Sequence, residues 1–254
     1  MNLVNKEYHK RAKVLLANWQ DSRGVSTPFE WSPDKALATI IELNLLTADA
    51  SISEVNKLCK FAREYGVAGL VVNPVHVERC VEVLGGGVPV GTVVGFPLGA
   101  NHSKIKVAET ELAVEQGARN ISMVINSGLL KTSNFQEVFE EMRAVRYACP
   151  EADLTIILET ALLEPVGVII ACMLCREAGA DAVKGSTAFT GPGAPPENVS
   201  LMRFVLGDDL DIVASGSSMD REGMVSLLKV GATRLTVGFL ATDDTLHDLI
   251  KRFD

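Results

Sequence analysis

Four segments of this chain repeat one pattern, and this repeat constrains the fold more than any other feature of the sequence. In each segment an amphipathic stretch ends at a glycine and a short apolar run follows; the four glycines are Gly66, Gly117, Gly179 and Gly231. Because a glycine that closes a helix readily takes the left-handed conformation, the pattern predicts a helix, a tight turn and then a strand. The apolar runs alternate little with polar residues, which is typical of parallel strands covered on both faces.

Further candidate strands lie in the segments ATIIEL, VGTVVGF, LTIILE and LDIVAS. Together with the repeats they give roughly eight strands that alternate with helices about 30 residues apart, and this favours a (β/α)8 TIM barrel. An open doubly wound sheet uses the same units. However, no GxGxxG follows the first strand, and the glycine run at Gly85–Pro89 precedes a strand instead of following one.

The length suits one α/β domain, because α/β barrels use about 250 residues. Residues 1–34 differ from the rest, since they combine a basic helical pattern with a loop that contains SRGVSTPFEWSP. We therefore expect an N-terminal helical extension over residues 1–34 that packs on a single barrel formed by residues 35–254.

Composition excludes several classes of function. The chain has a net charge of −8, which disfavours a broad nucleic-acid surface because phosphate binding needs clustered Lys and Arg. No apolar run reaches the roughly 18 residues that span a membrane, and charges interrupt the N-terminal segment, so we expect neither a membrane partner nor a secretory signal. Five cysteines, an odd number, indicate reduced thiols and a cytoplasmic protein.

In barrels of this kind the reactive groups lie at the C-terminal ends of the strands. Lys184 ends the apolar run of Ala182 and Val183 and therefore draws attention. A lysine inside a barrel is costly unless it is paired, neutral or functional, and burial lowers its pKa and frees the amine to attack a carbonyl. The same electrostatics also allows a structural ion pair with Glu159, at the end of the preceding strand.

Two more residues are candidates for catalysis. Glu159 can act as a general acid or base, although we favour its role as the counter-charge of Lys184. Ser122 shares one strand face with Val124 and Asn126 because side chains alternate along a strand. A small filler of the barrel interior is the simpler interpretation of Ser122.

We predict no metal site. Cys172 and Cys175 form a CxxC, but inside a helical apolar pattern in which residues three apart usually pack. The four histidines show no ligand spacing. The turn at Thr190–Asn198 can grip a phosphate or can simply connect two elements, and its three prolines remove donors and weaken the first interpretation.

Several of these segments together resemble one known family. The strings VVGFPLGANHSKIKVAETELAVEQGA, ISMVIN and EAGADAVKGSTAF are similar to those of the deoxyribose-phosphate aldolases, and the resemblance runs from about residue 41 to residue 240. It implies a (β/α)8 barrel and a class I aldolase in which Lys184 forms a Schiff base with a small-molecule carbonyl substrate. It also implies catalysis without a metal or organic cofactor, and a homo-oligomer, a dimer by resemblance.

The chain departs from the family pattern at several places. The family has an Asp that shuttles protons where this chain has Ser122, and a second Lys where this chain has Val213. The phosphate-binding ASGG reads Ala214–Ser217 here. The early IDHTLL motif reads Ile41–Leu46, and the last GTSSG turn reads Thr236–Leu240.

These changes remove charged and hydroxyl groups from the expected mouth of the barrel. We expect Leu43, Val213, Val237, Phe239 and Leu240 to enter the mouth in their place. Since a phosphate needs several donors or a cation, this predicts a less polar or unphosphorylated substrate. The residues that we expect to contact it are Glu42, Asn44, Asn126, Thr187, Val213, Ser215, Gly216, Ser217, Gly238 and Phe239.

Three functions remain open from the sequence. The first is a class I aldolase that joins or cleaves a carbon–carbon bond through Lys184. The second is a Schiff-base enzyme for another reaction, such as dehydration, cyclisation or decarboxylation. The third is a non-catalytic relative that binds a ligand, because a fold alone does not fix a function.

Overall fold

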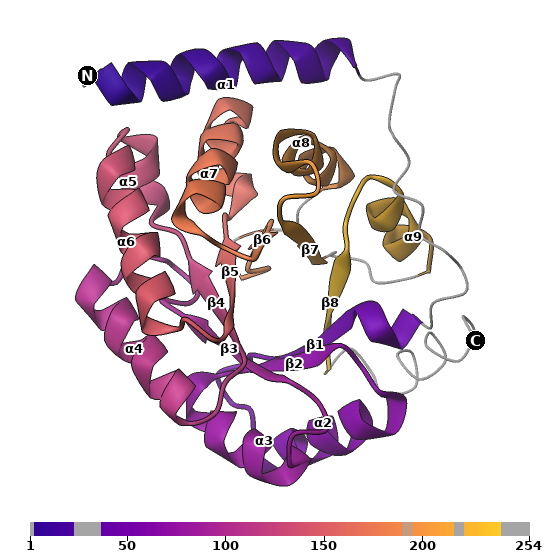
Figure 1. The fold of residues 1–254 in the computed structure, drawn as a ribbon. Coiled ribbons are helices and arrows are strands. Elements are labelled where there is room, and N and C mark those ends of the chain that lie inside the picture. Colours follow the sequence, from indigo (N-terminus) through magenta and orange to yellow (C-terminus); the bar gives the residue numbers. More distant parts are fainter. Residues whose placement is uncertain are drawn as a thin grey trace.

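The computed structural model describes residues 3–22, 37–189, 191, 193, 195–215 and 221–239. Eight parallel strands close into a barrel in sequence order, so the predicted (β/α)8 fold is confirmed (Figure 1). The strands are β1 (Ile41–Leu45), β2 (Gly69–Val72), β3 (Val90–Val94), β4 (Asn120–Val124), β5 (Asp153–Ile157), β6 (Ala182–Lys184), β7 (Asp211–Ser215) and β8 (Arg234–Gly238).

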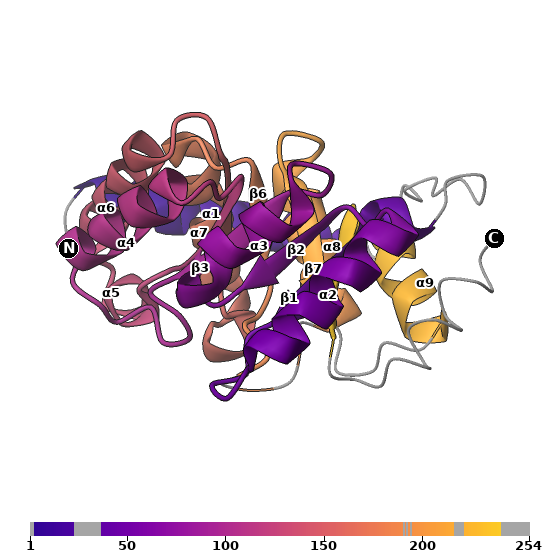
Figure 2. The same ribbon diagram turned by 90° about the horizontal axis from the view of Figure 1, so that it is seen from below.

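Helices surround this barrel. They are α1 (Leu3–Asp21), α2 (Ile52–Tyr65), α3 (Val77–Leu84), α4 (Ser103–Glu115), α5 (Ser127–Lys131), α6 (Phe135–Ala148), α7 (Pro165–Ala178), α8 (Pro196–Leu206) and α9 (Arg221–Lys229), with short 3₁₀ turns η1 (Leu37–Ile40), η2 (Pro74–His76) and η3 (Thr160–Leu162). Figure 2 shows α2 and α3 side by side on the outside of the barrel, where α2 contacts β1 and β2 and α3 contacts β3.

The local signals in the sequence explain where helices begin and end. Ser51 and Glu54 form a capping box at the start of α2, which satisfies backbone donors that the helix leaves open. Gly66 and Gly179 end α2 and α7 in the left-handed conformation, as the repeat predicts. The helix-to-strand turns are therefore set by local chemistry along the chain.

The main core lies between the strands and the helices, not inside the barrel. Each strand sends alternate side chains outward into this layer, for example Val183 from β6 and Leu235 from β8. Helix α7 is apolar on all sides, and every side chain from Val168 to Cys175 is buried. Cys172 and Cys175 belong to this packing and are free thiols.

Helix α1 covers the outer side of α7 and α8 (Figure 1). Ala12 and Trp19 are buried in this contact, and the Trp19 indole donates to Ser200 Oγ of α8 at 3.4 Å. Residues 23–36, which contain the expected boundary at residue 34, lie outside the described residues. The helix seals an apolar surface that α7 would otherwise expose.

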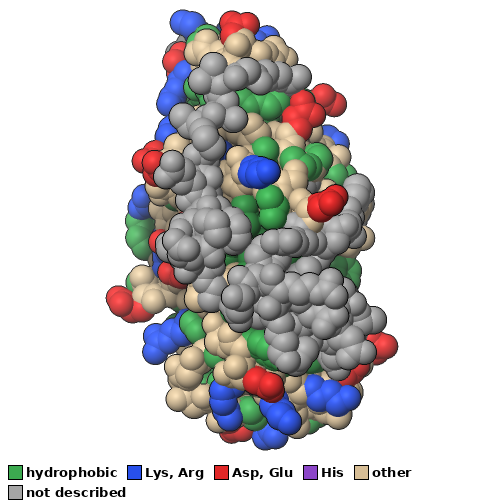
Figure 3. Space-filling view, turned by 90° about the vertical axis from the view of Figure 1, so that its right-hand side faces the viewer, with side chains coloured by type: hydrophobic (Ala, Val, Ile, Leu, Met, Phe, Trp, Pro, Cys, Tyr) green, Lys and Arg blue, Asp and Glu red, His purple; other side chains and the backbone are tan. Residues whose placement is uncertain are grey.

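The described helices include none that is long and apolar enough to cross a membrane. On the face drawn in Figure 3, acidic and basic side chains are interspersed with apolar ones, and neither sign gathers into a continuous surface among the residues that are coloured.

Candidate active site

The strand registers arrange the inward side chains of the barrel in layers, each supplied by alternate strands. Lys184 points inward because its neighbour Val183 packs outward into the helical layer. Its own layer holds Val71 of β2, Ser122 of β4 and Thr236 of β8. The layer nearer the N-terminal ends of the strands holds Glu42, Gly91, Thr155 and Val213, and the layer nearer the mouth holds Asn44, Val93, Ile157 and Ser215.

The Lys184 side chain is 6% exposed. Within the part of the chain that the structure describes, its amine has no hydrogen bond and no ion pair. Burial lowers the pKa of Lys184, and the charges of Glu42 and, to a smaller extent, Glu159 oppose that shift. An amine that has no acceptor and a lowered pKa is more often neutral, and a neutral amine can attack a carbonyl.

The expected ion pair between Lys184 and Glu159 does not form. Glu159 has a left-handed backbone with φ of 52°, and its buried carboxylate turns toward the segment that follows β6. Ser186 Oγ donates to one oxygen at 2.9 Å, and the Thr187 backbone N–H donates to the other at 3.1 Å. The Thr187 hydroxyl also donates to Glu159. Glu159 therefore organises this turn and acts on Lys184 only as a nearby charge.

The hydrogen-bond donors of the turn after β6 bind acceptors within the protein. The backbone N–H of Ala188 donates to Ser186 Oγ at 2.9 Å, and that of Phe189 donates to Thr187 Oγ1 at 3.1 Å. Ser215 Oγ donates to the carbonyl of Ser186 at 3.2 Å. Thr187 and Ser215, which we expected to bind substrate, thus use their hydroxyls inside the protein.

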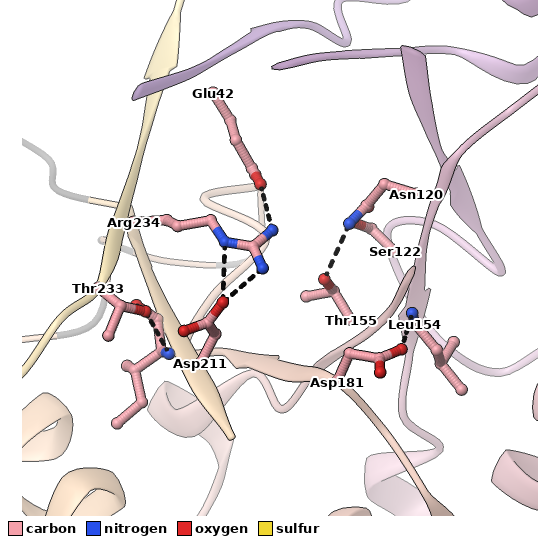
Figure 4. A network of polar contacts seen from close by, with 10 residues as sticks. Glu42, Asn120, Ser122, Leu154, Thr155, Asp181, Asp211, Thr233 and Arg234 are labelled. Atoms are coloured by element: carbon pink, nitrogen blue, oxygen red, sulfur yellow. Dashed lines mark hydrogen bonds and ion pairs between the residues drawn. The ribbon is translucent and has the colours of Figure 1, made fainter. Parts of the chain in front are cut away.

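Ser122 lies in the layer of Lys184. Its hydroxyl donates to Asn120 Oδ1 at 3.1 Å, and Asn120 Nδ2 donates in turn to Thr155 Oγ1 at 3.3 Å (Figure 4). Ser122 is therefore tied to groups nearer the N-terminal end of the barrel. Asn126 caps α5, where its Oδ1 accepts the Leu129 N–H at 3.1 Å.

Glu42 and Val213 lie in the layer beneath Lys184, and Val213 is the register partner of the lysine on β7. Glu42 Oε1 accepts from Arg234 Nη1 at 3.2 Å, and Arg234 Nε donates to Asp211 Oδ2 at 3.1 Å (Figure 4). Two carboxylates thus hold the one arginine among the described inward residues of the barrel. The family's second lysine has no cationic replacement at Val213.

The expected entry of apolar residues into the mouth is wrong for Leu43, Val237 and Phe239. All three are buried in the layer between strands and helices, and the Phe239 ring packs edge-on against Phe61 of α2 with 5.9 Å between centroids. The reason is alternation, since Glu42 and Gly238 face inward and their neighbours must face outward.

Asn44 and Gly238 do face the mouth side by side. A Cβ on Gly238 would lie 3.6 Å from Asn44 Oδ1. Gly216, Ser217 and Leu240 lie outside the described residues, as do Thr190, Pro192 and Ala194 of the turn at Thr190–Asn198.

The sequence reasoning missed Thr236. It lies in the Lys184 layer, and its buried hydroxyl has no hydrogen-bond partner among the described residues. Counting back two residues from Gly238 along the strand would have found it, because both positions face inward.

The loops at the mouth carry exposed apolar side chains. Val75 follows β2, Leu98 follows β3 and Phe189 follows β6, and they are 79%, 67% and 53% exposed. The Phe96 and Phe189 rings meet edge to face, with 4.9 Å between centroids. The entrance to the lysine is therefore lined in part by apolar groups. The described residues contain no cluster of His, Cys, Asp and Glu that could hold a metal ion.

Comparisons with known proteins show the family to which this chain belongs. The sequence profile of the DeoC/LacD family aldolase matches residues 32–235. Proteins named deoxyribose-phosphate aldolase from Clostridium perfringens and Geobacillus sp. are 42% and 43% identical over 201 residues, which are 78% of this chain and 90% of each relative.

Solved structures show the same likeness over more of the chain. A protein from Coccidioides immitis, solved as a candidate deoxyribose-phosphate aldolase, superposes with a TM-score of 0.84 at 33% identity and covers 96% of this chain and 97% of its own. A deoxyribose phosphate aldolase from Aeropyrum pernix, described as a tetramer, gives a TM-score of 0.76 at 26% identity over 94% of this chain and 96% of its own.

Proposed function

Because this chain belongs to the DeoC/LacD family of aldolases and is a carbon–carbon lyase, we propose that Lys184 carries its reaction as a Schiff-base nucleophile. The observation that carries the proposal is the buried amine of Lys184, which has a lowered pKa and no partner among the described residues. Its expected counter-charge, Glu159, is engaged elsewhere.

The steps follow from the chemistry of an amine and a carbonyl. The neutral Lys184 amine adds to the carbonyl carbon of the donor, and loss of water gives an iminium. The iminium withdraws electrons, so that the neighbouring carbon loses a proton and becomes an enamine. The enamine carbon then adds to an acceptor aldehyde, and hydrolysis returns the free lysine. The reverse sequence cleaves a 3-hydroxy aldehyde.

The substrate is less polar than deoxyribose 5-phosphate, and it is unphosphorylated. A phosphate needs several N–H or O–H donors or a cation. The donors of the turn after β6 are spent on Glu159, Ser186 and Thr187. Arg234, the arginine inside the described barrel, is held by two carboxylates. The apolar side chains at the mouth favour an apolar substituent, since burial contributes about 25 cal/mol per Å².

The decisive experiment is borohydride trapping of a panel of aldehydes and ketones, followed by mass spectrometry of the peptide that carries Lys184. We expect a mass increase at Lys184, and no increase in a Lys184→Met variant. Lys106→Met, which removes another buried lysine, is the matched control and keeps the adduct at Lys184. Failure of every carbonyl to trap would overturn the Schiff-base proposal.

A second assay separates the substrates. Retro-aldol cleavage is measured for 3-hydroxy aldehydes that differ only in a terminal phosphate. We expect faster cleavage of the unphosphorylated members. Turnover of deoxyribose 5-phosphate at ordinary enzyme rates of roughly 1–10³ per second would contradict the substrate proposal and leave the Schiff base intact.

We also propose that the chain forms a homo-oligomer. The relative from Aeropyrum pernix is described as a tetramer, which supports this proposal. Light scattering coupled to size-exclusion chromatography tests it, and a mass of 27.3 kDa at micromolar concentration would contradict it.

A further inference from the structure

The hydroxyl of Thr236 is a buried polar group inside the barrel. Thr236 is 2% exposed, and its oxygen lacks a hydrogen-bond partner within the part of the chain that the structure describes. An unmade hydrogen bond of a buried group costs about 1–3 kcal/mol. Because Thr236 shares the layer of Lys184, a bound molecule or water at the lysine is the natural partner for this hydroxyl.

Thr236 is also the register partner of Glu42 on β1, and both face inward. Neighbouring strands lie about 4.7–4.9 Å apart, so the two side chains start close together. Arg234 holds Oε1 of Glu42, and Glu42 Oε2 makes no hydrogen bond to the described residues. Asp211 fixes Arg234 from its other side (Figure 4). Glu42 is thus anchored by one oxygen, with the other able to accept.

A cavity of about 280 Å³ opens below Glu42, at the N-terminal ends of the strands. Glu42, Gly69, Gly91, Asn120 and Arg234 are among its lining residues. Branched apolar side chains usually fill a TIM barrel at this level. Here two glycines leave space, and the polar groups can hydrogen-bond to water. Water can therefore reach Glu42 from the end of the barrel opposite to the mouth.

We propose that Thr236 and Glu42 form a proton relay that connects the substrate on Lys184 to water in the cavity at the N-terminal end of the barrel. This inference rests on the Schiff-base function proposed above. It assigns the work of the family's missing aspartate to two residues on other strands, β8 and β1. Ser122 and Glu159 are less suitable because both are engaged with other protein groups.

When the iminium becomes an enamine, the C–H bond of the donor breaks and its electron pair forms the new C=C bond, while the C=N pair returns to nitrogen. Thr236 Oγ takes the proton as its own hydroxyl proton passes to Glu42 Oε2. Glu42 then releases that proton to water in the cavity. The opposite sequence delivers a proton to the enamine carbon.

The test separates imine formation from proton transfer. Propanal in D₂O is the probe: borohydride trapping measures the imine at Lys184, and NMR measures exchange of the α-hydrogen for deuterium. We expect Thr236→Val and Glu42→Gln to trap propanal like the unmodified protein but to exchange roughly 10²-fold more slowly, which is the low end for general acid–base catalysis. Thr236→Ser should restore exchange.

Thr155→Val is the matched control, because it removes another buried hydroxyl from the layer of Glu42 and should leave exchange unchanged. Circular dichroism confirms that each variant is folded. Normal exchange in Thr236→Val and in Glu42→Gln would overturn the relay while leaving the Schiff base in place. Absence of trapping in the unmodified protein would instead overturn the function on which the relay rests.

A second pair of variants tests the water route. A Cβ on Gly69 would lie 3.4 Å from the Pro89 carbonyl oxygen, an ordinary contact, so Gly69→Leu can fill the cavity. The same clearance, 3.4 Å from the Leu84 carbonyl oxygen, is found at exposed Gly87, and Gly87→Leu is its control. Slower exchange in Gly69→Leu alone is expected, and equal exchange in the two variants would overturn entry from this end.

Discussion

Two buried lysines in this molecule have opposite surroundings. Lys106, on α4, places its amine 2.8 Å from Glu141 Oε2 and 2.9 Å from the Val124 carbonyl oxygen. Lys184 has neither kind of acceptor among the described residues. Burial lowers the pKa of both amines. Burial alone therefore does not distinguish the two lysines, whereas the presence or absence of a partner among the described residues does.

The largest expected effect sharpens this contrast by chemistry. Lys184→Met should abolish borohydride trapping, with a loss of at least about 10³-fold because the nucleophile is gone. Lys106→Met should retain trapping per folded molecule. Quantitative mass spectrometry of the trapped peptide measures both. Trapping at Lys106 in the unmodified protein would break the comparison.

The second effect is on stability. Lys106→Met should lower the free energy of unfolding by about 3–5 kcal/mol, because it leaves the Glu141 carboxylate buried without a partner. Burial already raises the pKa of Glu141. Urea unfolding followed by circular dichroism measures the loss. The double variant Lys106→Met with Glu141→Leu should recover most of it, and a double variant as unstable as the single one would contradict the ion-pair explanation.

The third effect has the opposite sign. Lys184→Met should raise the free energy of unfolding at neutral pH by about 0.5–2 kcal/mol, because it removes an unpaired amine from the barrel interior. Since burial lowers the folded-state pKa of Lys184, the folded protein binds fewer protons than the unfolded chain between that pKa and about 10.4. The penalty is therefore present at low pH and fades as the pH rises through this window.

Urea unfolding at pH 7 and pH 10.5 checks this sign, with Lys106→Met as the comparison. If the increase in the free energy of unfolding caused by Lys184→Met became larger at higher pH, the Lys184 amine would not be unpaired.

The smallest effect concerns the backbone near each lysine. Gly95, with φ of 65°, lies against Lys106, whose Cε would be 2.8 Å from an added Cβ. Near Lys184 the left-handed position is instead held by Ala188, with φ of 61°. Ala188→Gly should therefore stabilise the protein by about 1 kcal/mol, the cost of this conformation for a residue with a Cβ. A thermal melt measures the shift, and a fall in Tm would show that the alanine is unstrained.

The sequence predicts the fold well because the signals for each β/α unit are local and recur along the chain. Helix-closing glycines and apolar runs mark each unit, and a parallel strand connected by helices has few ways to close. Lys184 could be found for the same reason, since it ends an apolar run. These features need no knowledge of distant residues.

The surroundings of Lys184 were harder to predict because they depend on side-chain direction. Leu43 and Phe239 are one residue away from inward positions, and a shift of one residue moves a side chain to the opposite face. Glu159 turns away from the lysine because its backbone is left-handed. This conformation is uncommon for a residue other than glycine, so the sequence does not predict it. Thr236 was missed because its register partner Glu42 lies on the first strand, far away in the sequence.

The apolar outer face of α7, which α1 covers, has a practical consequence. A designer who wished to trim this protein to its eight β/α units would discard α1 and leave a strip of aliphatic surface open to solvent. An exposed apolar surface of this kind promotes aggregation. Such a shortened protein would first need lysines and glutamates in place of the newly exposed apolar residues of α7. Helix α1 therefore keeps an apolar surface of the barrel out of contact with water.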